Sequence, residues 1–138
     1  MIKFIKMNPS ATLPRRGSDG AAGYDLYAAE QIEIPGGTRA LVKTGISTEF
    51  LDSIQANIRP RSGLSVKGID VGAGLIDSDY RGEIKALLIN NSHELLRINV
   101  NDRIAQIVFS PVLTCAVEWH GTVSETDRGH GGFGSTGN

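Results

Sequence analysis

Apolar and polar residues alternate along several short stretches of the chain. Over residues 54–58, apolar side chains alternate with Gln55 and Asn57, and the same period of two recurs over residues 96–100 and 113–119. This period places successive side chains on opposite faces of a β-strand. Each stretch therefore predicts a strand with one face in the core and the other in water.

Turn signals separate these stretches, and helical signals are nearly missing. Proline, glycine, asparagine and serine cluster at residues 35–37 and 90–92, as they do in turns. The only candidate for a helix is a short turn within residues 62–67. Many short strands joined by turns predict an all-β fold, a distorted antiparallel barrel or jelly roll with at most one short helix.

Two further stretches, residues 84–89 and 104–109, are apolar at both odd and even positions. A strand with this pattern is covered on both of its faces. Because a chain of 138 residues has few elements with which to cover them, the pattern indicates burial against another subunit.

Cys115 is the only cysteine, so one chain can build neither a disulfide framework nor a thiolate zinc site. It shares the apolar face of residues 113–119 with Trp119, and we expect both side chains to be buried in the core. The three histidines have no metal-ligand spacing and are expected on the surface; they are His93, His120 and His130.

Length and charge restrict the class of protein. A chain of 138 residues forms one domain. The formal net charge is −1 with acidic and basic residues interleaved, which argues against a nucleic-acid partner. No apolar run approaches the roughly 20 residues that span a bilayer, and the first residues lack the layout of a secretory signal. We expect a soluble intracellular protein without a membrane partner.

The end of the chain, residues 128–137, contains five glycines together with Arg128, Phe133, Ser135 and Thr136. A flexible backbone, an aromatic ring and several anion donors suit a nucleoside phosphate. Taken alone, the string is also typical of a disordered tail.

Residues 132–137 also match the dinucleotide fingerprint G-x-G-x-x-G. That motif follows a strand, opens a helix and is followed by an acidic residue about twenty positions later. Only Asn138 follows here, so the context does not support this interpretation.

Two internal segments carry further candidate chemistry. Residues 59–63 follow a predicted strand, and Arg61 and Ser62 could present a guanidinium and a hydroxyl to phosphate oxygens. The glycines of residues 72–82 allow the backbone to approach a ligand closely, with Asp77 beside them. Each segment alone is also compatible with an ordinary solvated turn.

Taken in order, five segments resemble the five motifs of the trimeric dUTP pyrophosphatases (dUTPases): residues 21–26, 60–64, 74–82, 102–106 and the glycine-rich end. The resemblance spans nearly the whole chain, and five ordered matches are far more specific than any one. It implies the jelly-roll-like β-clip fold of that family, with one barrel domain over residues 1–127 and a flexible arm over residues 128–138.

The resemblance also implies an activity. Members of the family hydrolyse dUTP to dUMP and diphosphate by attack of water on the α-phosphorus, with Mg²⁺, which limits uracil incorporation into DNA and supplies dUMP for thymidylate synthesis. The carboxylate that matches Asp77 is the general base. Whether Asp77 or Asp79 reaches the water depends on geometry that the residues alone leave open, and Asp79 is expected to help hold the turn.

The remaining site residues follow from the same resemblance. Uracil would pair with the main chain of Gly74, Leu75 and Ile76, while the Tyr80 ring lies against the deoxyribose. Phe133 and Gly134 would close over the base. Lys85 lies beside the pocket, where a solvated strand lysine is the alternative. The triphosphate would be bound by Mg²⁺ together with Arg61, Ser62, Gly63, Gln106, Arg128, Ser135 and Thr136, and Asp25 would touch the metal through water.

Family members are homotrimers whose active sites are shared, with the arm reaching onto a neighbour. Two alternatives stay open: a dCTP deaminase-type relative, which would need a catalytic Glu, and a dUTPase with an added nucleotide-switched regulatory binding role. The expected location is the cytoplasm, or the interior of a host cell if the protein is viral, with the nucleus possible if it is eukaryotic.

Overall fold

The computed structural model describes residues 1–134. Within them lie one helix and twelve strands, and the helix, α1 (Ser62–Ser65), falls inside the predicted helical turn. The strands are β1 (Lys3–Lys6), β2 (Arg15–Arg16), β3 (Tyr24–Tyr27), β4 (Ile32–Ile34), β5 (Arg39–Lys43), β6 (Ile46–Glu49), β7 (Ile54–Arg59), β8 (Ile69–Gly72), β9 (Leu75–Ile76), β10 (Lys85–Asn90), β11 (Leu96–Ile98) and β12 (Arg103–Pro111). The prediction of an all-β chain with one short helix is confirmed.

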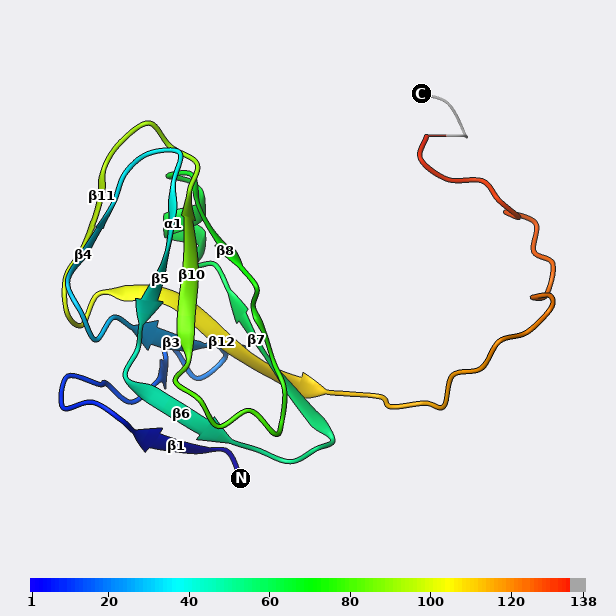
Figure 1. Cartoon of the computed structure of the whole chain (residues 1–138), viewed down its shortest axis with the longest axis horizontal. Helices are drawn as coiled ribbons and strands as arrows, with labels where there is room; N and C mark the ends of the chain where they lie inside the picture. Colours follow the sequence, from blue (N-terminus) through cyan, green and yellow to red (C-terminus); the bar gives the residue numbers. More distant parts are fainter. Residues whose placement is uncertain (135–138) are drawn as a thin grey trace.

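The strands form four antiparallel sheets. The largest has the order β2-β3-β12-β7-β9, and the others are β5-β10-β8, β1-β6 and β11-β4. Figure 1 shows β10 and β5 running steeply across the direction of β12, so that the sheets surround a common interior. This arrangement is a distorted antiparallel barrel.

The core draws on strands from both of the larger sheets. Leu26 of β3, Val42 of β5, Leu88 of β10 and Ile107 of β12 are all fully buried. Burial of such side chains is the main favourable term in folding. The barrel is therefore stabilised by contacts between residues that lie far apart in the sequence.

The alternating stretch at residues 54–58 forms β7 as predicted. Ala56 and Ile58 point into the core, while Asn57 between them is only half-buried. Strand β7 has a partner on each side, β12 and β9. Both edges of β7 thus have hydrogen-bonding partner strands within the chain.

The two stretches with apolar residues at both parities differ from each other. On β12, Phe109 makes edge-to-face contacts with Phe4, Tyr24 and Phe50, at centroid distances of 6.1, 6.1 and 5.5 Å. Residues of the same chain thus cover the side of β12 that carries Phe109 and the buried Ile107. On β10, Leu87 pairs with Leu41, which is 57% exposed. The sheet of β5 and β10 therefore keeps an apolar outer side, at Leu41 and the half-buried Leu87, that another chain could cover.

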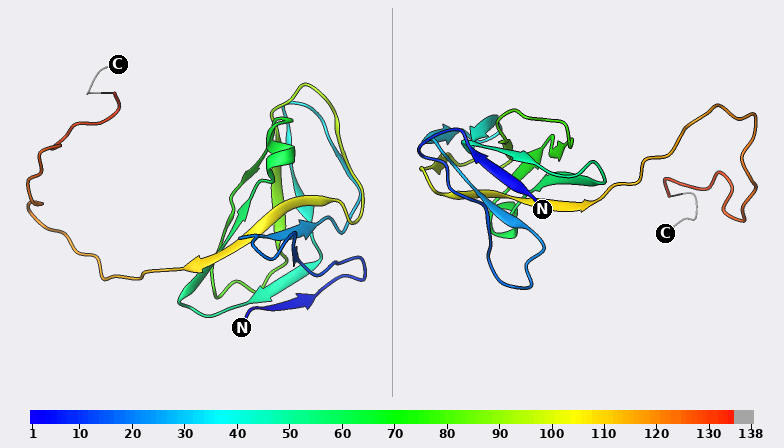
Figure 2. Two further views of the ribbon diagram at one scale, coloured as in Figure 1. Left: turned by 180° about the vertical axis from the view of Figure 1, so that it is seen from behind. Right: turned by 90° about the horizontal axis from the view of Figure 1, so that it is seen from below.

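The stretch at residues 113–119 does not form a strand. Strand β12 ends at Pro111, and the segment that follows, residues 112–134, extends away from the barrel in every view (Figures 1 and 2). We call this segment the tail. Cys115 is exposed and Trp119 is fully exposed, so the prediction that both are buried is wrong for the single chain.

The reason is that alternation alone does not make a strand, which also needs a neighbour to satisfy its backbone hydrogen bonds. No described strand lies beside the tail.

The three histidines are exposed, as expected. The boundary between residues 1–127 and 128–138 stays a prediction. Within residues 1–134, no helix has the length and apolar character to cross a membrane.

Candidate functional site

A cavity of about 340 Å³ lies beside the bend between β8 and β9 and the loop that follows β9. We call this bend the hairpin, although β8 pairs with β10 and β9 with β7, and not with each other. Residues that the sequence assigned to one site line this cavity together: Leu75, Ile76, Asp77, Tyr80 and Lys85. We call it the hairpin cavity. Five of the predicted site residues are therefore neighbours in the structure.

Gly74 fixes the position of the hairpin on the barrel. The Ile58 N–H donates to the Gly74 carbonyl at 2.7 Å, and β9 then pairs with β7. A Cβ atom at residue 74 would collide with the Ile58 carbonyl oxygen. Only glycine allows this close approach, and the approach holds the main chain of Leu75 and Ile76 against β7.

The loop after β9 distinguishes its two aspartates. The Tyr80 N–H donates to the Asp77 carbonyl oxygen at 3.2 Å and closes the turn. Both side chains are exposed, but Asp77 lines the hairpin cavity and Asp79 does not. The geometry therefore favours Asp77 over Asp79 as the group that reaches a ligand there.

Tyr80 and Lys85 flank the same cavity. The Tyr80 hydroxyl donates to the Glu83 carbonyl oxygen at 3.1 Å, and the side chain is 46% exposed. The Lys85 Nζ lies 4.0 Å from Glu83 Oε2. Lys85 is thus directed to the cavity and not only to bulk water.

A second group of predicted residues gathers around Asp25 on β3. Asp25 Oδ1 accepts a hydrogen bond from Arg61 Nε at 3.1 Å, and Asp25 Oδ2 accepts one from Arg103 Nη1 at 3.4 Å. Arg61 Nη1 also donates to the Arg103 carbonyl at 3.3 Å. The Asp25 side chain is only 15% exposed. We call these three residues the arginine cluster.

Gln106 links this cluster to the corner that carries Arg61. Its Nε2 donates to the Pro60 carbonyl at 2.9 Å, and its Cα is paired across the sheet with Asp25. A Cβ at Gly23 would lie 2.5 Å from Gln106 Oε1, so glycine makes room for the amide. Ser62 and Gly63 then follow at the exposed start of α1.

Sequence reasoning missed Arg103. Arg103 lies in residues 102–106, the same short segment as Gln106. Its presence in that segment was the signal that could have identified it as a candidate site residue. Its ion pair with Asp25 joins residues 78 positions apart, which no local pattern reveals.

The hairpin cavity and the arginine cluster do not meet within one chain. Arg61 and Arg103 line a separate cavity of about 280 Å³, and no residue lines both cavities. The predicted site residues on the barrel therefore form two separate groups in a single chain.

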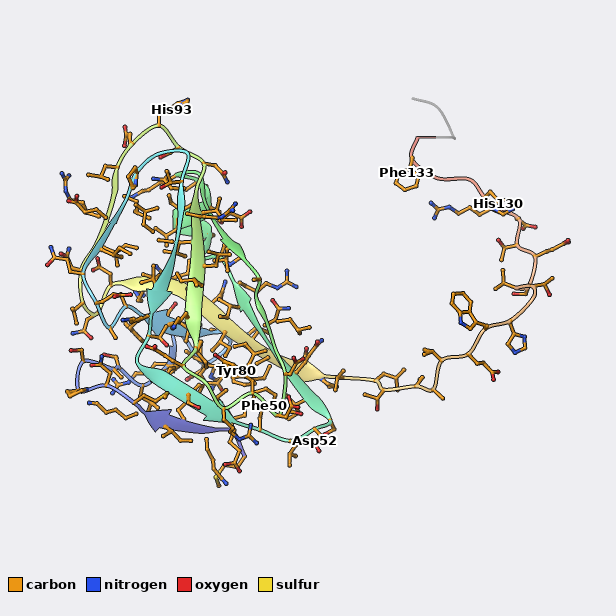
Figure 3. All side chains as sticks on the ribbon, viewed as in Figure 1. Phe50, Asp52, Tyr80, His93, His130 and Phe133 are labelled. Carbon is orange, nitrogen blue, oxygen red and sulfur yellow. The ribbon has the colours of Figure 1, made fainter. Side chains whose placement is uncertain are left out.

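The described part of the tail contains the remaining candidates. Figure 3 shows Phe133 far from Tyr80, and the Phe133 side chain is fully exposed. Arg128 Nε donates to the Gly131 carbonyl at 2.7 Å within the tail itself. Phe133 and Gly134 both have positive φ angles, of 50° and 86°. Ser135 and Thr136 lie outside the described residues.

The chain is similar to known proteins along almost its whole length. The family model named dUTPase matches residues 9–137. The deoxyuridine 5'-triphosphate nucleotidohydrolase of Monkeypox virus is 48% identical over 136 residues, which cover 99% of this chain and 90% of that protein. The corresponding protein of Vaccinia virus (strain Copenhagen) is 47% identical, covering 99% of this chain and 92% of that one.

Solved structures show the same fold. The dUTPase of Staphylococcus bacteriophage 80alpha with dUpNHpp superimposes with a TM-score of 0.93 at 24% identity, over 100% of this chain and 99% of that one. A mutant dUTPase of phage phi11 of S. aureus, described with a structural Mg(II) ion, gives 0.83 at 21% identity, over 88% and 97%. The predicted jelly-roll-like fold is thereby confirmed. The family model and the poxviral relatives cover almost all of the sequence, and this chain belongs to the dUTPase family of enzymes.

Proposed function

We propose that this protein hydrolyses dUTP to dUMP and diphosphate by attack of a water molecule on the α-phosphorus. The observation that carries the proposal is the hairpin cavity, which places a carboxylate, an aromatic ring and main-chain groups around one space. Family membership and the names of the poxviral relatives support the same substrate.

Asp77 is the general base of the proposed reaction. As the water oxygen bonds to the α-phosphorus, its proton passes to the Asp77 carboxylate, and the bond to the bridging oxygen breaks to release diphosphate. The position of Asp77 on the lining of the hairpin cavity supports this role.

Recognition of the nucleoside is assigned to the hairpin. Uracil pairs with the main chain of Gly74, Leu75 and Ile76, which β7 holds in place. The Tyr80 ring lies where a 2′-hydroxyl would collide, so ribonucleotides are refused by shape. Phe133 and Gly134 cover the base from the arm, a stack worth about 1–3 kcal/mol.

Recognition of the triphosphate is assigned to the arginine cluster and its surroundings. Asp25 holds the Arg61 guanidinium in a fixed orientation, which favours charge-assisted hydrogen bonds to phosphate oxygens. The other proposed donors are Ser62, Gly63, Gln106 and, from the arm, Arg128, Ser135 and Thr136. Lys85 adds a positive charge at the hairpin cavity.

Mg²⁺ is the proposed cofactor. It prefers oxygen ligands and keeps several waters. Within residues 1–134, no three or more His, Cys, Asp or Glu side chains are grouped to hold a metal ion. Both Asp25 carboxylate oxygens already accept hydrogen bonds. These residues fit a metal that the phosphates bind, with Asp25 touching it through water. Once bound, the ion neutralises phosphate charge.

We further propose a homotrimer with shared active sites, formed by a barrel over residues 1–127 and an arm over residues 128–138. The separation of the hairpin cavity from the arginine cluster supports this, because one chain does not join them. The exposed apolar residues of the tail and the exposed Leu41 on β5 also support it, since other chains can cover them. The arm would close over a neighbour's site.

Such an activity removes dUTP, which limits uracil in DNA, and supplies dUMP for thymidylate synthesis. The relatives named above are viral, which favours the interior of a host cell, with the cytoplasm as the compartment. The dCTP deaminase alternative lacks support, because the family model and the relatives are dUTPases.

The direct test is a substrate panel. The protein is incubated with dUTP, UTP, dTTP or dCTP in the presence of Mg²⁺, and diphosphate is measured. We expect diphosphate from dUTP only. Absence of diphosphate from dUTP, or release of ammonia from dCTP, would contradict the proposal.

A further inference from the structure

The loop that follows Tyr80, residues 81–84, is hydrogen-bonded through Arg81, Glu83 and Ile84 to the turn between β5 and β6 and to the start of β6. Every residue from 44 to 47 makes one hydrogen bond to residues 81–84. The four bonds run from Thr44 Oγ1 to the Ile84 carbonyl, from the Gly45 N–H to Glu83 Oε1 at 2.9 Å, from the Ile84 N–H to the Ile46 carbonyl at 2.8 Å, and from Ser47 Oγ to the Arg81 carbonyl at 3.1 Å. We call this set of bonds the clamp.

The β5–β6 side of the clamp belongs to the core. Thr44 is 1% exposed and Ser47 is 3% exposed. Gly45 has a φ angle of +68°, and a Cβ there would lie 2.9 Å from the Cβ atoms of Asn8 and Ala11. This turn therefore has no room to shift. Through the clamp it holds residues 81–84 in place.

The Tyr80 side chain rests on the other side of the clamp. Its hydroxyl donates to the Glu83 carbonyl, and its ring lies directly over Gly82. A Cβ at residue 82 would lie 2.5 Å from Tyr80 Cζ, so the ring occupies this place only because residue 82 is glycine. The ring position is thus set by residues 82 and 83 together.

We propose that Glu83 is a positioning residue for sugar selection, and that Gly82 provides the seat of the Tyr80 ring. The inference rests on the proposed function, in which that ring refuses a 2′-hydroxyl. Rejection of one hydroxyl by shape requires a ring that does not move aside. The Glu83 carboxylate supplies this rigidity by binding the Gly45 N–H, while its carbonyl holds the tyrosine hydroxyl.

The test compares kcat/KM for dUTP and UTP in the full-length protein. Glu83→Ala removes the bond to Gly45 and should lower the dUTP:UTP ratio about tenfold, since displacement by a fraction of an ångström is costly at an active site. Glu83→Gln keeps an oxygen for the Gly45 N–H and should preserve the ratio. Gly82→Ala displaces the exposed ring without touching the core and should also lower the ratio about tenfold.

A matched control separates sugar selection from general loss of stability. Thr48 Oγ1 donates to the Lys3 carbonyl at 2.9 Å and is 1% exposed, but it belongs to no part of the clamp. Thr48→Val should therefore lower the melting temperature and leave the dUTP:UTP ratio unchanged.

Binding of dUpNHpp and of its ribonucleotide counterpart is measured beside turnover. An unchanged preference in both Glu83→Ala and Gly82→Ala would overturn the inference while leaving the proposed function standing. A wild-type protein that neither hydrolyses dUTP nor prefers the deoxynucleotide would overturn the proposed function and, with it, the inference.

Discussion

In the proposed function, the hairpin cavity and the arginine cluster recognise the substrate by different physical means. The hairpin cavity depends on backbone position, because Gly74 and Gly82 allow close approaches that a Cβ would forbid. The arginine cluster depends on charge, because a mostly buried carboxylate orients two guanidiniums. Changes at the hairpin should therefore alter chemistry and selectivity, whereas changes at the cluster should alter affinity.

The largest effect is expected from Asp77→Asn. Loss of the proposed general base should lower kcat for dUTP by about 10³, the scale of general acid–base catalysis. Binding of dUpNHpp, measured by calorimetry, should persist. Asp79→Asn is the control and should stay close to wild type, because Asp79 does not line the cavity. An Asp77→Asn protein that loses binding but keeps its rate would refute the assignment.

Removal of residues 128–138 should have the second largest effect on activity. The truncated protein loses Phe133 and the phosphate donors of the arm, and we expect kcat/KM for dUTP to fall about a hundredfold. Its mass by light scattering should stay that of a trimer, since residues 1–127 form the contacts between chains in the proposed assembly. Near-normal activity, or a monomer, would count against the proposed role of the arm.

Arg103→Ala tests the arginine cluster. Loss of one guanidinium and of its contact with Asp25 should raise the KM for dUTP about tenfold with a smaller change in kcat. Arg97→Ala is the matched control, because Arg97 lines the same cavity but pairs with Glu33 on the surface. Equal effects of both substitutions would mean that overall charge, and not the contact with Asp25, sets affinity.

The smallest effect concerns the pairing of β1 with β6. The hydrogen bond from the Lys3 ammonium, followed by its charge, holds the pKa of Glu49 below its ordinary value. A carboxyl whose pKa is lowered by folding stabilises the protein above its unfolded pKa, and this contribution disappears as the pH falls through the folded pKa.

Wild type should therefore melt slightly higher than Glu49→Gln at neutral pH. The difference should vanish as the pH falls below about 4, the ordinary range of a glutamate carboxyl. Thermal melts at pH 7 and pH 3 measure it. A difference that grows on acidification would show that the pKa of Glu49 is not lowered in the folded protein.

The strands of the barrel were predicted correctly from the sequence where their pairing partners lie in the same chain. The alternation over residues 54–58 forms β7 because β12 and β9 flank it. The same alternation over residues 113–119 predicted a strand that does not form, because no described strand pairs with the tail. Periodicity reports which face is apolar, and it does not report whether a partner strand is present.

The candidate site shows the same division. The structure places Asp77, Tyr80 and Lys85, which the ordered motifs assigned to one site, on the lining of one cavity. Their roles there stay predictions. The seat of the Tyr80 ring on Gly82 and the contact of Arg103 with Asp25 were not predictable, because they depend on packing and on strand register.

The most direct test of a shared active site is complementation between two inactive variants. Asp77→Asn lacks the proposed base of the hairpin cavity, and Arg61→Ala lacks the proposed phosphate donor of the arginine cluster. Each is measured alone and after the two are co-expressed and purified together. If each site joins the hairpin of one chain to the cluster of another, mixed assemblies contain some intact sites, and dUTP hydrolysis returns well above that of either variant. If every site lies within one chain, no mixed assembly has both groups intact, and the mixture stays as inactive as its parts.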